Sequence, residues 1–182
     1  MQYDRTVKLK NGQFCRLRNA TANDAEAVLA NFRLTHAQTD YLLSYPDEDD
    51  KTVESEAKFL QGQTDSENGI EIAAEIDGKI VGLAGFSAIG GLEKIRHRAE
   101  FGVSVDSAYW GLGIGRALTR ACIELAKRAG YRQLELDAVA ANERAISLYS
   151  SEGFVEYGRN PRGFCSRVTG WQEIVLMRLE LD

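Results

Sequence analysis

The stretch of sequence that decides the fold runs from Val103 to Arg116 and reads VSVDSAYWGLGIGR. A strand-like run ends at Val105, and a glycine-rich loop then opens into an amphipathic helix expected over residues 114–129. Glycines let backbone amides approach a ligand without a Cβ atom in the way, and the first amides of a helix have no intrahelical acceptor. Such amides attract anions, so the segment predicts a site for a phosphate or pyrophosphate group.

Two nucleotide-binding motifs compete for these glycines. A Walker A loop needs a Lys followed by Ser or Thr at the helix start, where this chain has Arg116 and Ala117. A Rossmann fingerprint needs G-x-G-x-x-G directly after the strand, whereas here the spacing is G-x-G-x-G and five residues separate Val105 from Gly111. Because Asp137 stands about where a ribose-binding acid would lie, an NAD-binding enzyme remains one alternative. The other alternative is that these glycines serve only a tight turn and helix packing.

The remaining sequence predicts one mixed α/β domain over residues 1–182. Strands are expected over residues 14–18, 70–76, 80–86, 99–105, 134–139, 154–157 and 173–181, and helices over 24–35, 52–63, 114–129 and 143–151. Asp77-Gly78 between two apolar runs predicts a hairpin, because Gly tolerates the positive φ of such turns. Gly130 is expected to end the long helix.

Composition narrows the class of protein. Apolar residues make up 44% and charged residues 27% of the chain, which is typical of a globular protein. No signal peptide, membrane span or metal-ligand pattern is found, and three widely spaced cysteines favour a reducing, cytoplasmic compartment. The net charge of −5 argues against nucleic acid as a partner, because a phosphate backbone requires a basic surface. The sequence thus predicts a cytoplasmic protein with no membrane, nucleic-acid or metal partner.

Two motifs, in this order, carry a resemblance to a known family. The first runs from Trp110 to Gly115 and corresponds to R/Q-x-x-G-x-G/A after a strand, with Trp110 in place of the usual Arg or Gln. The second runs from Asn142 to Phe154 and reads NERAISLYSSEGF, matching Asn, then Ala, Leu-Tyr and Gly-Phe. The chain resembles the GNAT superfamily of acetyl-CoA-dependent N-acetyltransferases. This resemblance implies a mixed, mostly antiparallel sheet with a splayed acetyl-CoA cleft, flanked by helices.

The resemblance also implies roles for individual residues. The backbones of Val103 and Val105 would pair with the pantetheine arm, and Asn142 would hydrogen-bond it. The amides from Gly111 to Arg116 would hold the pyrophosphate. The implied acetyl-CoA-binding residues are Val103, Ser104, Val105, Gly111, Leu112, Gly113, Ile114, Gly115, Arg116 and Asn142. Asn142 is equally suited to cap the following helix, and the two roles are compatible.

The implied reaction is direct attack of a neutral amine on a thioester, which raises two protonation problems. A lysine-like amine has a pKa of about 10.4, so its neutral form is scarce at pH 7, at a cost of about 4–5 kcal/mol. Tyr149, with an ordinary pKa near 10, would protonate the leaving thiolate; its structural alternative is packing of its helix on the sheet. Glu100 is the candidate base, with His97 or a water relay as alternatives, although its position favours a half-exposed ion pair over that role.

The acceptor is expected to be the amine of a small molecule or of a peptide N-terminus. The acidic run Asp47–Asp50 is a candidate border of the acceptor site or a solvated turn, and Arg162–Phe164 is another candidate border. A non-catalytic acyl-CoA-binding sensor is the alternative to an enzyme, and a homodimer is compatible with the fold.

Overall fold

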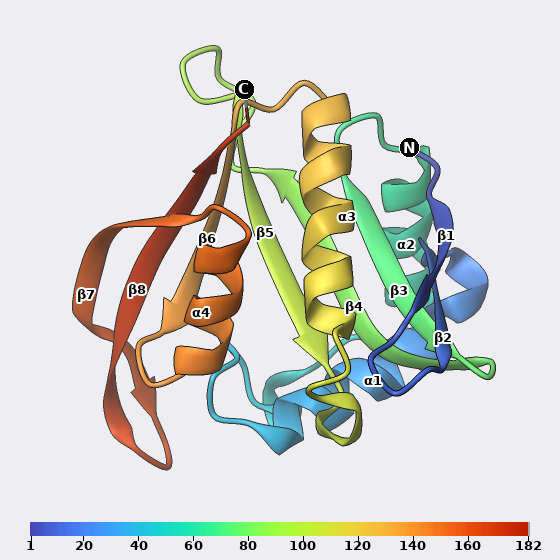
Figure 1. The fold of residues 1–182 in the computed structure, drawn as a ribbon, viewed down its shortest axis with the longest axis horizontal. Helices are drawn as coiled ribbons and strands as arrows, with labels where there is room; N and C mark the ends of the chain where they lie inside the picture. Colours follow the sequence, from blue (N-terminus) through green and yellow to red (C-terminus); the bar gives the residue numbers. More distant parts are fainter. Residues whose placement is uncertain (182) are drawn as a thin grey trace.

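A single eight-stranded sheet organises the chain (Figure 1). The structure, a computed structural model, describes residues 1–181. The strands are β1 (Asp4–Lys8), β2 (Phe14–Asn19), β3 (Ile70–Ile76), β4 (Lys79–Ala88), β5 (Arg98–Val105), β6 (Gln133–Val139), β7 (Val155–Ser166) and β8 (Gly170–Glu180). The helices are α1 (Ala25–Gln38), α2 (Val53–Asp65), α3 (Ile114–Arg128) and α4 (Glu143–Ser151), with short 3-10 turns η1 (Ala22–Asp24), η2 (Pro46–Glu48) and η3 (Ser107–Tyr109).

The sheet divides between β5 and β6. In the order β1-β2-β3-β4-β5-β6-β8-β7, every neighbouring pair is antiparallel except β5 and β6. These two parallel strands pair only where Arg98–Glu100 lies beside Gln133–Glu135. Beyond Glu100 they diverge, as Figure 1 shows in the middle of the sheet. The mixed, mostly antiparallel and splayed sheet expected from the sequence is confirmed.

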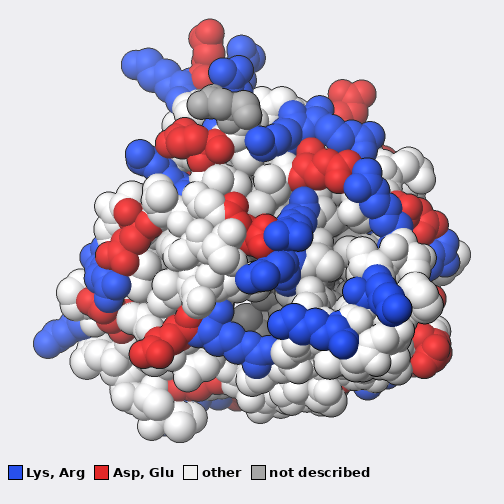
Figure 2. Space-filling model, in the orientation of Figure 1, with Lys and Arg blue, Asp and Glu red and all other residues white. Residues whose placement is uncertain are grey.

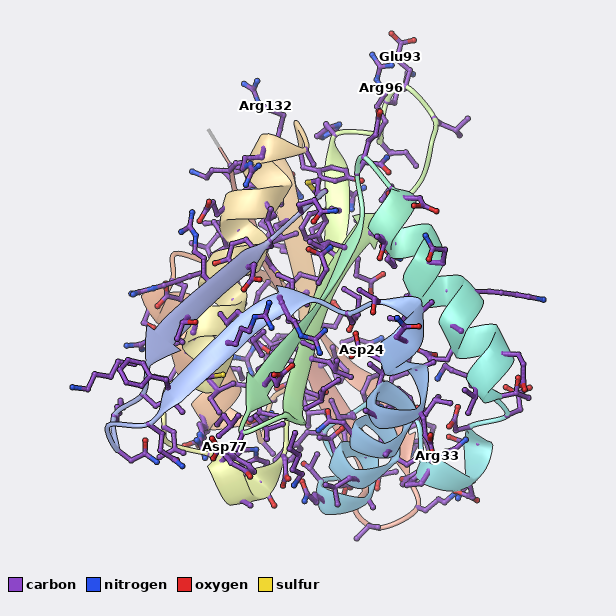
Figure 3. All side chains as sticks on the ribbon, turned by 90° about the vertical axis from the view of Figure 1, so that its right-hand side faces the viewer. Asp24, Arg33, Asp77, Glu93, Arg96 and Arg132 are labelled. Carbon is purple, nitrogen blue, oxygen red and sulfur yellow. The ribbon has the colours of Figure 1, made fainter. Side chains whose placement is uncertain are left out.

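Helices cover both faces of the sheet. Figure 3 shows α1 and α2 on one side of the sheet and α3 on the other, while α4 lies beside α3 in Figure 1. The predicted inward residues of α3 are all buried: Ile114, Leu118, Ala121, Cys122 and Leu125. They pack in the larger core with strands β3 to β6, and a smaller core lies under α1 and α2. The divergence of β5 and β6 is therefore flanked by helices on both faces.

Local turns follow the sequence signals. Asp77 and Gly78 both have positive φ, 49° and 79°, and join β3 to β4 as a two-residue hairpin (Asp77 is labelled in Figure 3). Gly130 follows α3 with a φ of 85°, as expected for the residue after a helix. No helix within residues 1–181 is long and apolar enough to span a bilayer.

Three strands depart from the prediction. β1 was not predicted, and its side chains are mostly exposed. β7 and β8 form a much longer hairpin than the expected residues 154–157 and 173–181. Their pairing is irregular between Asn160 and Phe164, around Pro161. Proline has no amide donor and is tolerated in edge strands, where β7 lies, so the strand continues past it.

An ion-pair cluster ties β2 to the start of α1. The Arg18 guanidinium bonds both carboxylate oxygens of Asp24 at 2.8 and 2.9 Å and lies 2.8 Å from the Glu75 carboxylate (Asp24 is labelled in Figure 3). Arg18 lowers the pKa of Asp24 to about 2, with further hydrogen bonds from Thr21. Because the folded pKa lies below the usual value, this contribution to stability is present above pH 4 and is lost as the pH falls towards 2.

Replacement of Asp24 by Asn is expected to lower the free energy of unfolding by about 1–2 kcal/mol at pH 7, because it removes the charge that Arg18 stabilises. Urea unfolding at several pH values measures the effect, which should vanish near pH 2. Asp4→Asn is the matched control, because Asp4 pairs with Arg16 on an exposed surface. An equal loss in both variants, or a loss independent of pH, would contradict the assignment.

Candidate active site

A cavity of about 640 Å³ lies between β5, the start of α3 and α4. Of the residues predicted to bind acetyl-CoA, nine line it: Val103, Ser104, Val105, Gly111, Gly113, Ile114, Gly115, Arg116 and Asn142. Leu112 does not. It is partly buried against the larger core, and its carbonyl accepts a hydrogen bond from the Lys10 amide at 3.1 Å. The predicted proton donor, Tyr149, also lines the cavity, whereas the predicted base, Glu100, does not.

The glycine loop presents free backbone amides to this cavity. Gly113 caps α3 with a φ of 100°, and the first helical bond runs from the Ala117 amide to its carbonyl at 3.0 Å. The amides from Ile114 to Arg116 therefore have no acceptor within the helix. The space in front of Gly111 and Gly113 is open, because a Cβ atom added there would meet no atom within 4 Å. The loop thus fits an anion such as pyrophosphate.

Trp110 anchors the glycine loop to the end of β5. Its indole nitrogen donates a hydrogen bond to the Val105 carbonyl at 2.7 Å. The Arg144 guanidinium lies over the indole ring, 5.2 Å from its centroid. Lys10 and Arg116 also line the cavity, and Figure 2 shows Lys and Arg side chains around a hollow in the lower half of this face. Several cations thus surround the expected anion site, although Trp110 itself is neutral.

Asn142 begins α4. Its side-chain oxygen accepts a hydrogen bond from the Ala145 amide at 3.2 Å, which confirms the predicted helix cap. The same side chain lines the cavity, so capping orients it there.

Tyr149 combines packing with access to the cavity. Its ring meets Phe101 edge to face, with centroids 6.2 Å apart, and lies 5.9 Å from the Phe154 ring. Burial raises the pKa of Tyr149 to about 12, because the phenolate would lose its hydration. The phenol therefore stays protonated at neutral pH, as a proton donor requires.

A second cavity of about 390 Å³ lies on the opposite face of the sheet, beneath α1 and α2. Glu100 lines this cavity and is exposed to solvent. The two cavities share Leu42, Val103 and Ser104, so they meet at β5. Tyr149 and Glu100 thus reach the same strand from its two faces.

The other residues singled out in the sequence lie outside both cavities. His97 precedes β5, and its carbonyl accepts bonds from the Arg132 and Gln133 amides. Within the acidic run, Asp47 pairs with Arg167 at 2.7 Å, and Asp49 pairs with Arg33 (labelled in Figure 3) at 2.8 Å. The run is thus largely occupied by ion pairs.

The sequence prediction missed Glu71, on β3. Its side chain lines the second cavity and is partly buried. Burial, with a smaller contribution from the nearby Glu56 carboxylate, raises the pKa of Glu71 to about 8. The only available signal was an acidic residue within an otherwise apolar strand, IEIAAEI.

Residues 33–154, more than half of the chain, match the model of the acetyltransferase (GNAT) family. The chain belongs to the GNAT family. Among its GNAT relatives, the L-amino acid N-acyltransferase MnaT of Escherichia coli is 25% identical over 134 residues, which cover 73% of this chain and 77% of MnaT. A GNAT acetyltransferase from Streptococcus pneumoniae has a TM-score of 0.87 at 29% identity, covering 91% of this chain and 99% of the other.

A second solved structure supports the fold and contains a ligand. The yncA protein of Salmonella typhimurium, solved with its cofactor acetyl-CoA, has a TM-score of 0.79 at 22% identity, covering 91% of this chain and 93% of the other. The match to the family model shows that the protein is an acetyltransferase by family.

Proposed function

We propose that the protein transfers an acetyl group from acetyl-CoA to a primary amine of a small molecule or peptide N-terminus, by direct attack within a ternary complex in the cytoplasm. The observation that carries the proposal is the meeting of two cavities at β5. One cavity carries the GNAT motifs and the other carries carboxyl groups. Two substrates can therefore occupy the protein together, one on each face of the sheet.

The donor fits the first cavity. The amides of the glycine loop and the first turn of α3 would hold the pyrophosphate, and each charge-assisted bond is worth roughly 1.5–3 kcal/mol. The backbone of Val103–Val105 borders the divergence of β5 and β6, where the pantetheine arm would lie like an added strand. Asn142 would contact this arm. Acetyl-CoA supplies the acetyl group as a thioester, so the protein need only orient the thioester and transfer protons.

Two side chains would transfer the protons of the reaction. Tyr149 donates its phenolic proton to the leaving thiolate, and its raised pKa keeps the phenol protonated until that step. Glu100 borders the second cavity, so the proton of the acceptor amine leaves on that face, to a carboxylate directly or through water.

Thiol release from acetyl-CoA tests the activity against a panel of polyamines, arylalkylamines, amino acids and short peptides, with a control lacking acceptor. Acceptor-dependent release is expected, with intersecting double-reciprocal lines when both substrates are varied. Parallel lines would contradict the ternary complex. A flat panel from protein that binds CoA would favour a non-catalytic acyl-CoA sensor.

Replacement of Arg144 by Ala is expected to raise the Kd for CoA about 5- to 10-fold, because it removes a cation and its stacking on Trp110 at the donor cavity. Isothermal titration calorimetry measures the change. Arg128→Ala, at the exposed far end of α3, removes the same charge away from the cavity. Equal Kd values for the two variants would remove Arg144 from the donor site.

A further inference from the structure

We infer that Glu71 accepts the proton of the acceptor amine and that the acceptor is an arylalkyl or alkyl amine with no carboxylate beside its amino group. The inference rests on the proposed acetyltransferase function and names the substrate class and an additional catalytic residue. It follows from the position of Glu71, its surroundings and the charges around the second cavity.

Two glycines make room for the Glu71 carboxylate. Glu71 pairs with Gly85 on β4, and Gly85 pairs in turn with Gly102 on β5. A Cβ atom at Gly85 would collide with the Glu71 carboxylate, which therefore lies across that glycine. A Cβ atom at Gly102 would meet nothing within 4 Å, so the space between the carboxylate and β5 is open. Adjacent strands are about 4.8 Å apart, which leaves room for an amino group there.

This open space leads to the expected position of the thioester. Val103 and Ser104 follow Gly102 directly and border both cavities. An amine that contacts Glu71 over Gly85 and Gly102 is therefore one strand away from the donor cavity. Glu100 also borders the second cavity but is exposed, so a proton it accepts is shared with bulk water.

The environment of Glu71 suits a proton acceptor. Within residues 1–181, no side chain or backbone amide donates a hydrogen bond to its carboxylate. The charged and titratable groups around it are Glu56 from α2, His36 from α1, Glu100 from β5 and Cys122 from α3. The pKa of about 8 narrows the gap to a primary ammonium, near 10.4, to roughly 2 units. An ordinary glutamate would leave a gap of about 6 units.

The second cavity offers no Lys or Arg partner, among its described lining residues, for a carboxylate on the acceptor. Among the described residues that line it there is no Lys or Arg, and two are Glu. Burial lowers the pKa of His36, which favours its neutral form. Lys51, a cation on this side, lies over the Phe32 ring and pairs with Asp49 at 3.2 Å. An α-carboxylate would thus be desolvated without a cationic partner and repelled by the Glu71 and Glu100 carboxylates.

The walls fit an apolar substrate body. Phe32 and Leu42 face the cavity from the first helix and the loop after it, and Phe59 faces it from α2, with 47% of its surface exposed. An aromatic or alkyl chain would cover these side chains when bound, while its amino group extends to Glu71.

The protons of the reaction then balance. The ammonium gives its first proton to Glu71, which releases it to water. The neutral nitrogen forms the C–N bond with the thioester carbonyl carbon, the C–S bond breaks, and its electron pair remains on sulfur. Tyr149 protonates that sulfur, and the second proton lost by the nitrogen restores the phenol through water.

Matched substrate pairs that differ only in the carboxylate test the substrate class: phenethylamine and phenylalanine, tyramine and tyrosine, cadaverine and lysine. The wild-type enzyme is expected to acetylate the decarboxylated member of at least one pair with a kcat/KM at least tenfold higher. Equal or better use of the amino acids would overturn the inference and leave the acetyltransferase function intact. No acetylation of any amine would overturn both.

Glu71→Gln tests the proton acceptor. For the preferred amine, kcat/KM is expected to fall at least tenfold at pH 7.5, with an unchanged Kd for CoA. The wild-type profile of kcat/KM should rise with pH through an apparent pKa near 8, and the variant should lose that step. Glu67→Gln is the matched control, because Glu67 is exposed four residues earlier. Full activity of Glu71→Gln, or an unchanged profile, would overturn the assignment.

Two further variants keep the test decisive if Glu71→Gln folds poorly. Glu71→Asp retains the carboxyl and should restore part of the pH step. Gly102→Ala narrows the space beside the carboxylate without touching it and should raise the KM for the amine while CoA binding stays constant. An unchanged KM in Gly102→Ala would place the amine elsewhere.

Discussion

Replacement of Tyr149 by Phe is expected to lower kcat about 100-fold or more and to leave the Kd for acetyl-CoA within about twofold. The ring packs against Phe101 and Phe154 and lines the donor cavity, so Phe preserves the packing and removes only the hydroxyl. Without that proton donor, the thiolate must leave unprotonated or take its proton from water. Steady-state kinetics with the preferred amine measures kcat, and calorimetry measures donor binding.

Tyr131→Phe is the control for loss of a buried hydroxyl. Tyr131 is also buried, and its hydroxyl donates to the Asn68 carbonyl at 2.8 Å, outside both cavities. It should lose some stability and keep kcat. If Tyr149→Phe matched the wild type in kcat, Tyr149 would be a packing residue only.

Replacement of Gly113 by Ala is expected to raise the Kd for acetyl-CoA roughly 100-fold. A φ of 100° is strained for a residue with a Cβ atom, and relief of that strain would move the first amides of α3. Loss of one or two charge-assisted amide bonds, at about 1.5–3 kcal/mol each, accounts for such an effect. Calorimetric titration with CoA measures the Kd.

Gly130→Ala is the control that distinguishes the effect of backbone strain from the loss of donor binding. Gly130 lies at the other end of the same helix, also with positive φ and open space around it, so the substitution introduces similar strain away from the donor. Both variants should lose stability, and only Gly113→Ala should lose affinity. A similar loss of affinity in both would mean that general destabilisation, rather than the amides, lowers binding.

The sequence predicted the central helices and strands because the spacing of their apolar side chains follows which side chains are buried. The apolar spacing of α3 and the Asp77-Gly78 hairpin are local signals, and both are confirmed. β1 carries no such signal, since its backbone pairs at an edge while its side chains remain mostly exposed. The extent of β7 was hidden by Pro161, which usually ends a strand but is tolerated at the edge.

The donor cavity and the second cavity also differ in how far the sequence could predict them. The donor cavity depends on backbone amides within one continuous stretch, so a motif of glycines from Gly111 to Gly115 could reveal it. The second cavity is assembled from α1, α2 and strands β3 to β5, which are far apart in the sequence. The position of Glu71 depends on two glycines in neighbouring strands, and only the register of the sheet brings them together.

The short contact between β5 and β6 would couple the stability of the folded protein to binding of the acetyl donor. At its centre the sheet is joined near one end of β5 by pairing over Arg98–Glu100, by amide bonds to the His97 carbonyl and by the Arg98–Glu135 ion pair, and a bound donor would bridge the rest. A ligand present at 100 times its Kd adds about 2.7 kcal/mol to folding stability. A cell rich in acetyl-CoA would therefore protect this enzyme from proteolysis, and its abundance would follow the supply of the acetyl donor.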